Sequence, residues 1–249
     1  MDLSSPVCRA RSAVISCRRS DRHMIEIDVD LRSLLGPVRD QGARPTCLAF
    51  AASDTHAAAR GVLTPLSCEY AFFQAQKRCG RSPHEGASWY DMLSAIEENG
   101  QPIEDQWAYL AAVPVDLSQW TPPSGVDELF GRSHISLAAK VDLVRNALNF
   151  GSPVLIVAML SNSFFAPSAS GVVEAPADER PDPNLMHALV AVGHGKVNGQ
   201  PAVLVRNSWG AAWGIDGHAW LTDIYLKPSL AAAACLTEEC DVSRHPTAT

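Results

Sequence analysis

Residues 37–50 read PVRDQGARPTCLAF, a loop with glycine and proline that runs into an apolar stretch at Cys47. The pattern predicts a helix that is capped by Thr46 and ends at Gly61. A cysteine in the first turn of a helix lies at the positive end of the helix dipole, which stabilises a thiolate. The side-chain amide of Gln41 and the backbone N–H of the cysteine can donate hydrogen bonds to an oxyanion. We therefore expect a nucleophilic cysteine with two oxyanion donors beside it.

Two later segments supply partners for this cysteine. His187 stands at the start of an apolar run, LMHALVAVGHG at 185–195, which predicts a histidine held at the mouth of a strand. Asn207 lies in VRNSWGAAWG at 205–214 and can accept a hydrogen bond from the imidazole, which fixes the tautomer. The indole of Trp209 can shield that hydrogen bond from water. Cysteine, histidine and asparagine in these roles are suited to nucleophilic acyl transfer.

The ordered set Gln-Gly-x4-Cys, then His, then Asn-Ser-Trp-Gly-x2-Trp-Gly resembles the papain (C1) family of cysteine peptidases, in particular its bacterial stand-alone members. His187 follows Cys47 by 140 residues and Asn207 follows by a further 20, a separation typical of this family. The resemblance covers about residues 30–226. It implies a cysteine endopeptidase that forms a thioester on the cysteine, with the histidine as acid and base, the asparagine orienting it and Gln41 in the oxyanion hole. No cofactor and no metal is implied.

The resemblance also implies a substrate cleft whose main selective pocket receives the side chain at P2, the residue before the one that donates the scissile carbonyl. The expected walls are hydrocarbon, so an apolar P2 side chain is favoured over a charge that would be buried without a partner. The expected substrate-binding residues are Val157, Leu185 and Ala188, with Gly86 and Ala87 on the opposite lobe and Trp213 on the leaving-group side.

The chain departs from the family pattern near the expected nucleophile and at its ends. Arg44-Pro45-Thr46 stands where relatives commonly have Cys-Gly-Ser, and Gly86-Ala87 replaces a usual Gly-Gly. Arg44 thus replaces a cysteine that usually forms a disulfide, which agrees with a reducing compartment. Only about 30 residues precede the expected domain, so we expect no long inhibitory prosegment, and we expect the long polar loop 161–184 to gate the cleft instead.

Helical patterns dominate the first half of the chain, and short apolar runs separated by glycines dominate the second half. This division is typical of an α+β fold with segregated layers. The family resemblance implies a helical lobe packed against an antiparallel β-barrel-like lobe, with the active site in the cleft between them. The expected divisions are a basic leader (1–24), a peptidase domain (25–228, with a helical lobe at about 46–150 and a β lobe at about 25–45 plus 153–228) and a C-terminal tail (229–249).

Some segments are interpreted from local composition alone. The stretch 102–136 is rich in proline, tryptophan and serine and is expected to be irregular. The tail contains one possible alanine-rich helix and no clear partner in the chain. Asp54 and Glu69 are interpreted as ordinary solvated helix charges, and His56 as a structural residue.

The overall composition is that of a globular protein, with 47% hydrophobic residues and a net charge of −7. This charge offers no basic surface for nucleic acid or an anionic membrane, and no apolar run is long enough to cross a membrane. Without a signal segment, and with no compelling pairing among seven cysteines, the chain is expected in the cytoplasm, with non-classical export as the alternative. The expected partner is a peptide or protein substrate.

Three other functions fit the same residues. The thioester can be attacked by nucleophiles other than water, so the chain could deamidate or transpeptidate its substrate, which amine acceptors would reveal. It could be an effector peptidase directed at one protein. It could also be an inactive binding module, an alternative that the intact cysteine, histidine, asparagine and glutamine argue against and that thiol titration would decide.

Overall fold

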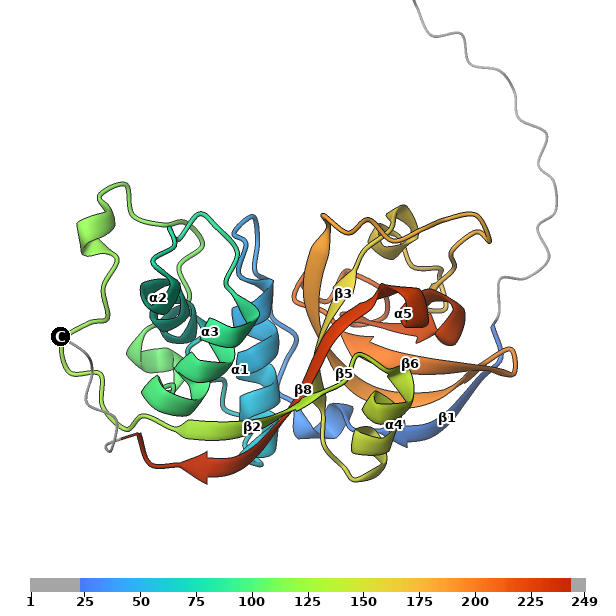
Figure 1. Ribbon diagram of the computed structural model, residues 1–249, viewed down its shortest axis with the longest axis horizontal. Coiled ribbons are helices and arrows are strands. Elements are labelled where there is room, and N and C mark those ends of the chain that lie inside the picture. The colour runs from blue at the N-terminus through green and yellow to red at the C-terminus, as the bar shows by residue number, and fades with distance from the viewer. Residues whose placement is uncertain (1–22, 243–249) are drawn as a thin grey trace, which may run out of the picture.

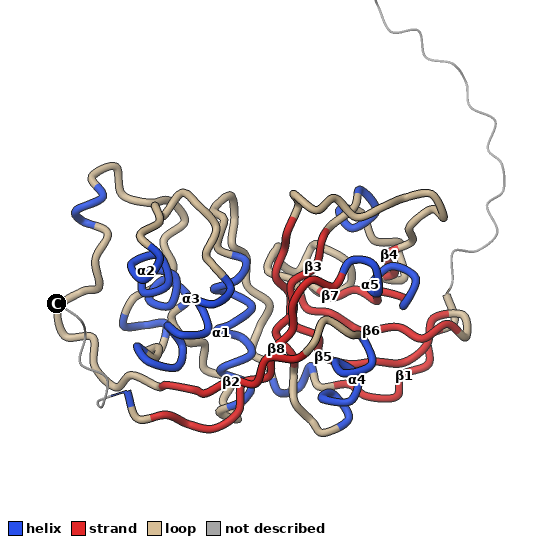
Figure 2. The backbone as a smooth tube through the Cα atoms, viewed as in Figure 1, coloured by secondary structure: helices blue, strands red, loops and turns tan. Residues whose placement is uncertain are grey.

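The computed structural model describes residues 23–242, which form two lobes lying side by side (Figure 1). One lobe is helical and the other is built on a large sheet, as Figure 2 shows by its colours. This arrangement confirms the α+β, two-lobed architecture expected from the sequence. The predicted leader (1–24) lies outside the described residues except for its last two, and so does the end of the predicted tail (243–249).

Three helices make up the helical lobe. Local capping explains two of their ends: Ser67 accepts a hydrogen bond from the N–H of Tyr70 at the start of the second helix, and Gly80 ends that helix with a φ of 64°. Thr46 makes no such bond to the first helix, contrary to prediction, and its hydroxyl lies 3.0 Å from Tyr109 Oη instead. The helices are α1 (Cys47–Ala59), α2 (Cys68–Cys79) and α3 (Trp89–Ser94), with a π-helical turn η2 (Ala95–Asn99) continuing α3.

The second lobe is centred on one sheet of eight strands, in the order β2-β8-β3-β5-β6-β7-β4, with β1 also paired to β5. All pairings are antiparallel except β4 with β7. The path ends at β2 and β4, so the sheet is open and the expected barrel-like closure is not formed. The strands are β1 (Ile25–Asp30), β2 (Gly131–Leu137), β3 (Val154–Met159), β4 (Val172–Val173), β5 (Met186–Val197), β6 (Gln200–Arg206), β7 (His218–Thr222) and β8 (Leu230–Cys240).

Smaller elements complete the chain. Two helices pack in the sheet lobe, α4 (Val141–Asn149) and α5 (Asp223–Ser229), and α4 buries Val144 and Leu148 in the same apolar cluster as strands β3 and β5. The predicted boundary of the helical lobe at about 150 is therefore wrong, because α4 belongs to the sheet lobe. Short 3₁₀ turns are η1 (Arg32–Leu34), η3 (Glu104–Gln106), η4 (Leu117–Gln119) and η5 (Asn162–Phe165).

Two segments differ from their sequence-based interpretation because they pair with each other. Residues 131–137, placed in an irregular stretch, form β2, and most of the predicted tail forms β8. β8 runs between β2 and β3, and its alanines 232–234 pair with those strands, so sheet hydrogen bonds override the helix propensity of alanine. This pair carries the sheet out to the helical lobe, as Figure 2 shows.

Helix α1 lies at the centre of the molecule, between the other helices and the sheet (Figure 1). Residues 48–53 are all buried, and three of the six are alanines. A helix that is apolar on every side belongs in a core, and small side chains allow β5 to approach it closely. Burial of α1 fixes the position of its first residue, Cys47, at the edge between the lobes. In residues 23–242 no helix has the length and apolar character needed to span a membrane.

Candidate active site

Cys47 is the first residue of α1 and opens onto a cleft of about 510 Å³ between the lobes. His187, the second residue of β5, lines the same cleft from the sheet side. The predicted nucleophile and base are therefore brought together from different lobes. The other residues lining the cleft are Pro45, Leu48, Arg81, Glu85, Gly86, Ala87, Trp89, Val157, Met186 and Ala188.

The imidazole of His187 is held by Asn207, which follows β6 directly. Its Nε2 lies 2.7 Å from Asn207 Oδ1, and the same oxygen accepts the backbone N–H of Ser208 at 2.8 Å. Because that atom already accepts a backbone donor, it is the amide oxygen, and Nε2–H of the imidazole is the second donor to it. The Nδ1 of the neutral imidazole is then unprotonated and free to accept a proton.

Aromatic rings enclose this hydrogen bond. The indole of Trp209 lies 4.6 Å from the imidazole, centroid to centroid, and the ring of Phe164 lies 6.0 Å from it. His187 keeps only 5% of its surface exposed. The predicted shielding role of Trp209 thus agrees with its position, and Phe164 is a second shield that the sequence did not indicate.

Burial dominates the ionisation of both groups. It raises the pKa of the Cys47 thiol, which hydrogen bonds from the backbone amides of Ala188 and Leu48 only partly oppose. It also lowers the pKa of His187 to about 4, against the opposite effect of Asn207. Burial thus acts against the stabilisation of the thiolate that we expected from the helix start. It disfavours the charged form of each group taken alone.

Gln41 is buried at the same end of α1. Its Nε2 donates to the carbonyl of Arg44 at 2.8 Å, and its Oε1 accepts the hydroxyl of Ser208 at 2.7 Å. The backbone N–H of Gln41 donates to the carbonyl of Ser208 at 2.8 Å. The amide is therefore held in one orientation, and its second Nε2 hydrogen has no partner among the described residues. Ser208 was not predicted, although it stands between the asparagine and the tryptophan of the motif.

Most predicted substrate-binding residues line the cleft, and two do not. Gly86, Ala87, Val157 and Ala188 are on its walls. Leu185 precedes β5, is 43% exposed and lies outside the cleft, where Met186 takes its place. Trp213 is buried in the core of the sheet lobe and donates its indole N–H to the carbonyl of Phe164 at 3.1 Å.

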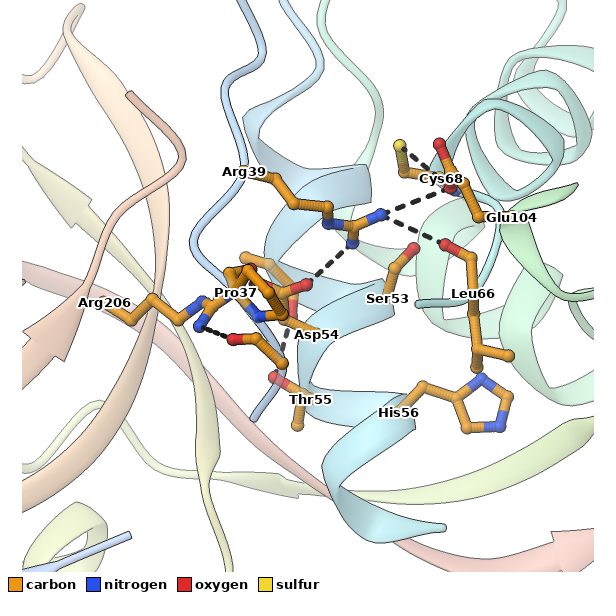
Figure 3. Close-up of polar contacts among 12 residues, drawn as sticks. Pro37, Arg39, Ser53, Asp54, Thr55, His56, Leu66, Cys68, Glu104 and Arg206 are labelled. Atoms are coloured by element: carbon orange, nitrogen blue, oxygen red, sulfur yellow. Dashed lines mark hydrogen bonds and ion pairs between the residues drawn. The ribbon is translucent and has the colours of Figure 1, made fainter. Parts of the chain in front are cut away.

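Asp54 and Glu69, interpreted as solvated charges, are in fact ion-pair partners, Asp54 partly buried and Glu69 fully buried. Asp54 on α1 accepts Arg39 Nη2 and Arg206 Nε, each at 2.7 Å. Figure 3 shows Arg39 reaching across α1 and Arg206 approaching α1 from the sheet side. Arg206 is the last residue of β6 and directly precedes Asn207. Its ion pair with Asp54 therefore connects the end of β6 to α1, the helix that begins at Cys47. The sequence offered no local signal for this, because the three residues are far apart along the chain.

Known proteins resemble this chain over most of its length. The model of the papain family cysteine proteases matches residues 25–234. Cysteine proteinase 3 of Dictyostelium discoideum is 29% identical over 202 residues, which are 78% of this chain and 57% of that protein. Caricain of Carica papaya is 27% identical and covers 76% of this chain and 52% of caricain. The chain spans a little over half the length of these curated relatives.

Solved structures show the same fold. Xylellain, a cysteine protease from the bacterium Xylella fastidiosa, superposes with a TM-score of 0.68 at 21% identity over 86% of this chain and 87% of xylellain. Bromelain from Ananas comosus superposes with a TM-score of 0.63 at 20% identity, over 84% of this chain and 97% of bromelain. Fold and site together define a papain-like cysteine protease scaffold, and this chain belongs to the papain family of cysteine proteases.

Proposed function

We propose that this chain hydrolyses peptide bonds as a cysteine endopeptidase. The observation that carries the proposal is the hydrogen bond between His187 Nε2 and Asn207 Oδ1, 2.7 Å long, on a histidine that shares one cleft with Cys47. A histidine fixed in this tautomer accepts a proton at Nδ1, which is the task of a base beside a thiol.

The chemistry begins with proton transfer from Cys47 Sγ to His187 Nδ1. Burial disfavours either charge alone, but the transfer creates a thiolate and an imidazolium side by side, so each stabilises the other. The thiolate attacks the scissile carbonyl carbon, and the carbonyl electron pair moves onto the oxygen. The intermediate collapses to a thioester as the imidazolium gives its proton to the departing amine. Water, deprotonated by the neutral imidazole, then releases the acid and restores the thiol.

Two donors are available to the oxyanion of these intermediates. The backbone N–H of Cys47 has no partner within the helix because it lies in the first turn of α1. The free Nε2 hydrogen of Gln41 is the second donor. A preorganised donor of this kind lowers a barrier by roughly 3 kcal/mol.

A peptide is the substrate that the cleft suits best. Ala87, Val157 and Ala188 supply a hydrocarbon wall on both lobes, and Met186 adds a flexible apolar side chain at the rim. The proposed P2 pocket is thus apolar, in a cleft that also holds the backbone of Gly86 for main-chain contacts.

The direct test is a peptide-library cleavage assay with the wild-type chain and Cys47→Ala side by side. Cleavage by the wild type and none by the variant is expected. Addition of an amine acceptor such as hydroxylamine separates hydrolysis from transfer, because transfer would yield the acceptor adduct as the main product. Stoichiometric labelling of Cys47 by an epoxide without any cleavage would contradict the proposed peptidase function.

A further inference from the structure

A buried ion pair lies beneath the loop that carries Gln41. Arg44 is 6% exposed and Glu69, on α2, is fully buried. Arg44 Nη1 donates to Glu69 Oε2 at 2.6 Å and Nη2 donates to Oε1 at 2.9 Å, a bidentate pair. Neither residue is one of the catalytic groups described above. The two hydrogen bonds fix both the position and the orientation of the Arg44 guanidinium.

Both carboxylate oxygens of Glu69 accept further hydrogen bonds. The indole N–H of Trp120 donates to its Oε1 at 2.7 Å, and the backbone N–H of Leu110 donates to its Oε2 at 3.0 Å. Arg44 Nη1 also donates to the carbonyl of Leu110 at 2.6 Å, and its guanidinium lies over the ring of Tyr109 at 5.1 Å. Within the pair, Arg44 Nε is buried without a hydrogen-bond partner among the described residues. The other polar atoms are paired, and displacement of the side chains would leave these buried groups unpaired too, so the pair is held rigidly.

The main chain of Arg44 connects this pair to the oxyanion donor. Its carbonyl oxygen accepts both Gln41 Nε2 at 2.8 Å and the N–H of Thr46 at 2.9 Å. Tyr109 Oη, which lies beside the guanidinium, donates to the carbonyl of Gln41 at 2.6 Å. These hydrogen bonds hold the loop from 41 to 46 at both ends. The side-chain amide of Gln41 donates to the backbone carbonyl of Arg44, and the ion pair fixes the side chain of that same residue.

We propose that Arg44 and Glu69 are positioning residues for the oxyanion hole: their buried ion pair fixes the Arg44 carbonyl and so aims the free Nε2 hydrogen of Gln41 into the cleft. Neither side chain touches the substrate. This inference rests on the proposed function for its kinetic consequence, whereas the orientation of the Gln41 amide is a property of the fold alone.

The kinetic test is a double-mutant cycle. The variant Arg44→Met/Glu69→Gln removes both charges together, so that no single charge is left buried. We expect kcat to fall at least about tenfold with KM within about twofold. In a Gln41→Ala background the same two changes should cost less than about twofold, because the residue they position is absent. A matched pair on the surface, Arg78→Met/Glu98→Gln, breaks the ion pair at the end of α2 and should leave kcat unchanged.

The proposal would be overturned if Arg44→Met/Glu69→Gln lowered kcat by the same factor with and without Gln41→Ala. Full kcat in a folded Arg44→Met/Glu69→Gln variant would overturn it as well. Arg44→Lys keeps the charge but loses the bidentate geometry, so it provides a second cycle if the double variant does not fold. Alkylation of Cys47 by iodoacetamide passes through no oxyanion, and its rate should be the same in all folded variants.

A spectroscopic measurement separates this inference from the proposed function. The side-chain amide of Gln41 is assigned in a ¹⁵N spectrum by its absence from Gln41→Ala. We expect the amide proton that is bonded to the Arg44 carbonyl to exchange slowly with solvent in the wild type, and about as fast as that of a free glutamine in Arg44→Met/Glu69→Gln. Unchanged slow exchange in that variant would sink the inference even if the chain is a peptidase, and the predicted change would support it even if no peptide is cleaved.

Discussion

Ser208 donates its hydroxyl to Gln41 Oε1 at 2.7 Å, although the two residues are 167 positions apart. The hydrogen bond joins the Asn-Ser-Trp motif of the sheet lobe to the loop before α1. The residue that follows Asn207 therefore holds the side-chain amide of Gln41, the proposed oxyanion donor, while Asn207 itself holds the imidazole of His187, the proposed base. Both orientations depend on the same short segment after β6.

Ser208→Ala should lower kcat about fivefold and leave KM within about twofold. One side-chain hydrogen bond contributes roughly 1 kcal/mol net, and the amide that loses it can rotate away from the oxyanion. Steady-state kinetics on a peptide ester measure both constants. Ser136→Ala, an exposed serine on β2, is the matched control. An equal loss in both variants would show that the effect is not specific to Gln41.

His187→Ala should abolish turnover, whereas Asn207→Ala should leave a measurable remnant. The histidine moves protons in every step, but the asparagine only holds it at 2.7 Å, so the imidazole of Asn207→Ala still reaches a productive orientation part of the time. Single-turnover assays with both variants give the comparison. Equal residual rates would mean that the histidine contributes nothing without Asn207, whereas nearly full activity of Asn207→Ala would mean that the aromatic rings alone orient the imidazole.

On acidification, kcat/KM should fall with an apparent pKa of about 4. His187 must be neutral to accept the thiol proton, and burial lowers its pKa to about 4, so the base is lost only when the pH falls through that value. A pH–rate profile from pH 3 to 8 with an uncharged substrate measures this fall. An apparent pKa close to 6.5 would show that the imidazole is better hydrated in solution than in this structure.

His56 should make the folded state sensitive to acid. It is fully buried on α1, donates from Nδ1 to Gln101 Oε1 at 2.9 Å, and burial lowers its pKa to about 4. Since the folded pKa lies below that of the unfolded chain, 6.5, the unfolded state binds more protons as the pH falls between these values.

The free energy of unfolding should therefore drop on acidification, by about 2 kcal/mol between pH 7 and pH 5 for this one residue. Urea unfolding at both pH values measures the change, and His56→Gln should lose about 2 kcal/mol less than the wild type. The exposed His84→Gln should behave like the wild type. An identical loss in His56→Gln would exclude His56 as the cause.

A peptide with leucine at P2 should be cleaved with a higher kcat/KM than one with arginine or aspartate there. Ala87, Val157 and Ala188 offer no partner for a charge, while full burial of a leucine side chain contributes about 1.5–3 kcal/mol. A series of peptides that differ only at P2 gives the ranking. If arginine proves best, the side chain reaches Glu85 at the cleft mouth and the pocket assignment is wrong.

The sequence by itself determined the residue types of the site, because acyl transfer requires a nucleophile, a base, an orienting amide and an oxyanion donor in fixed order. It also indicated a helix end that depends on neighbouring residues, at Gly61 just after α1, whose φ is 68°. Only the tertiary structure decided the rest. Alanines of β8 form a strand because β2 and β3 pair with them, and Asp54 and Glu69 are ion-pair partners because arginines distant in sequence lie beside them. The pKa of Cys47 follows the same rule: the start of α1 is a local feature, but burial between two lobes is not, and burial is the larger effect.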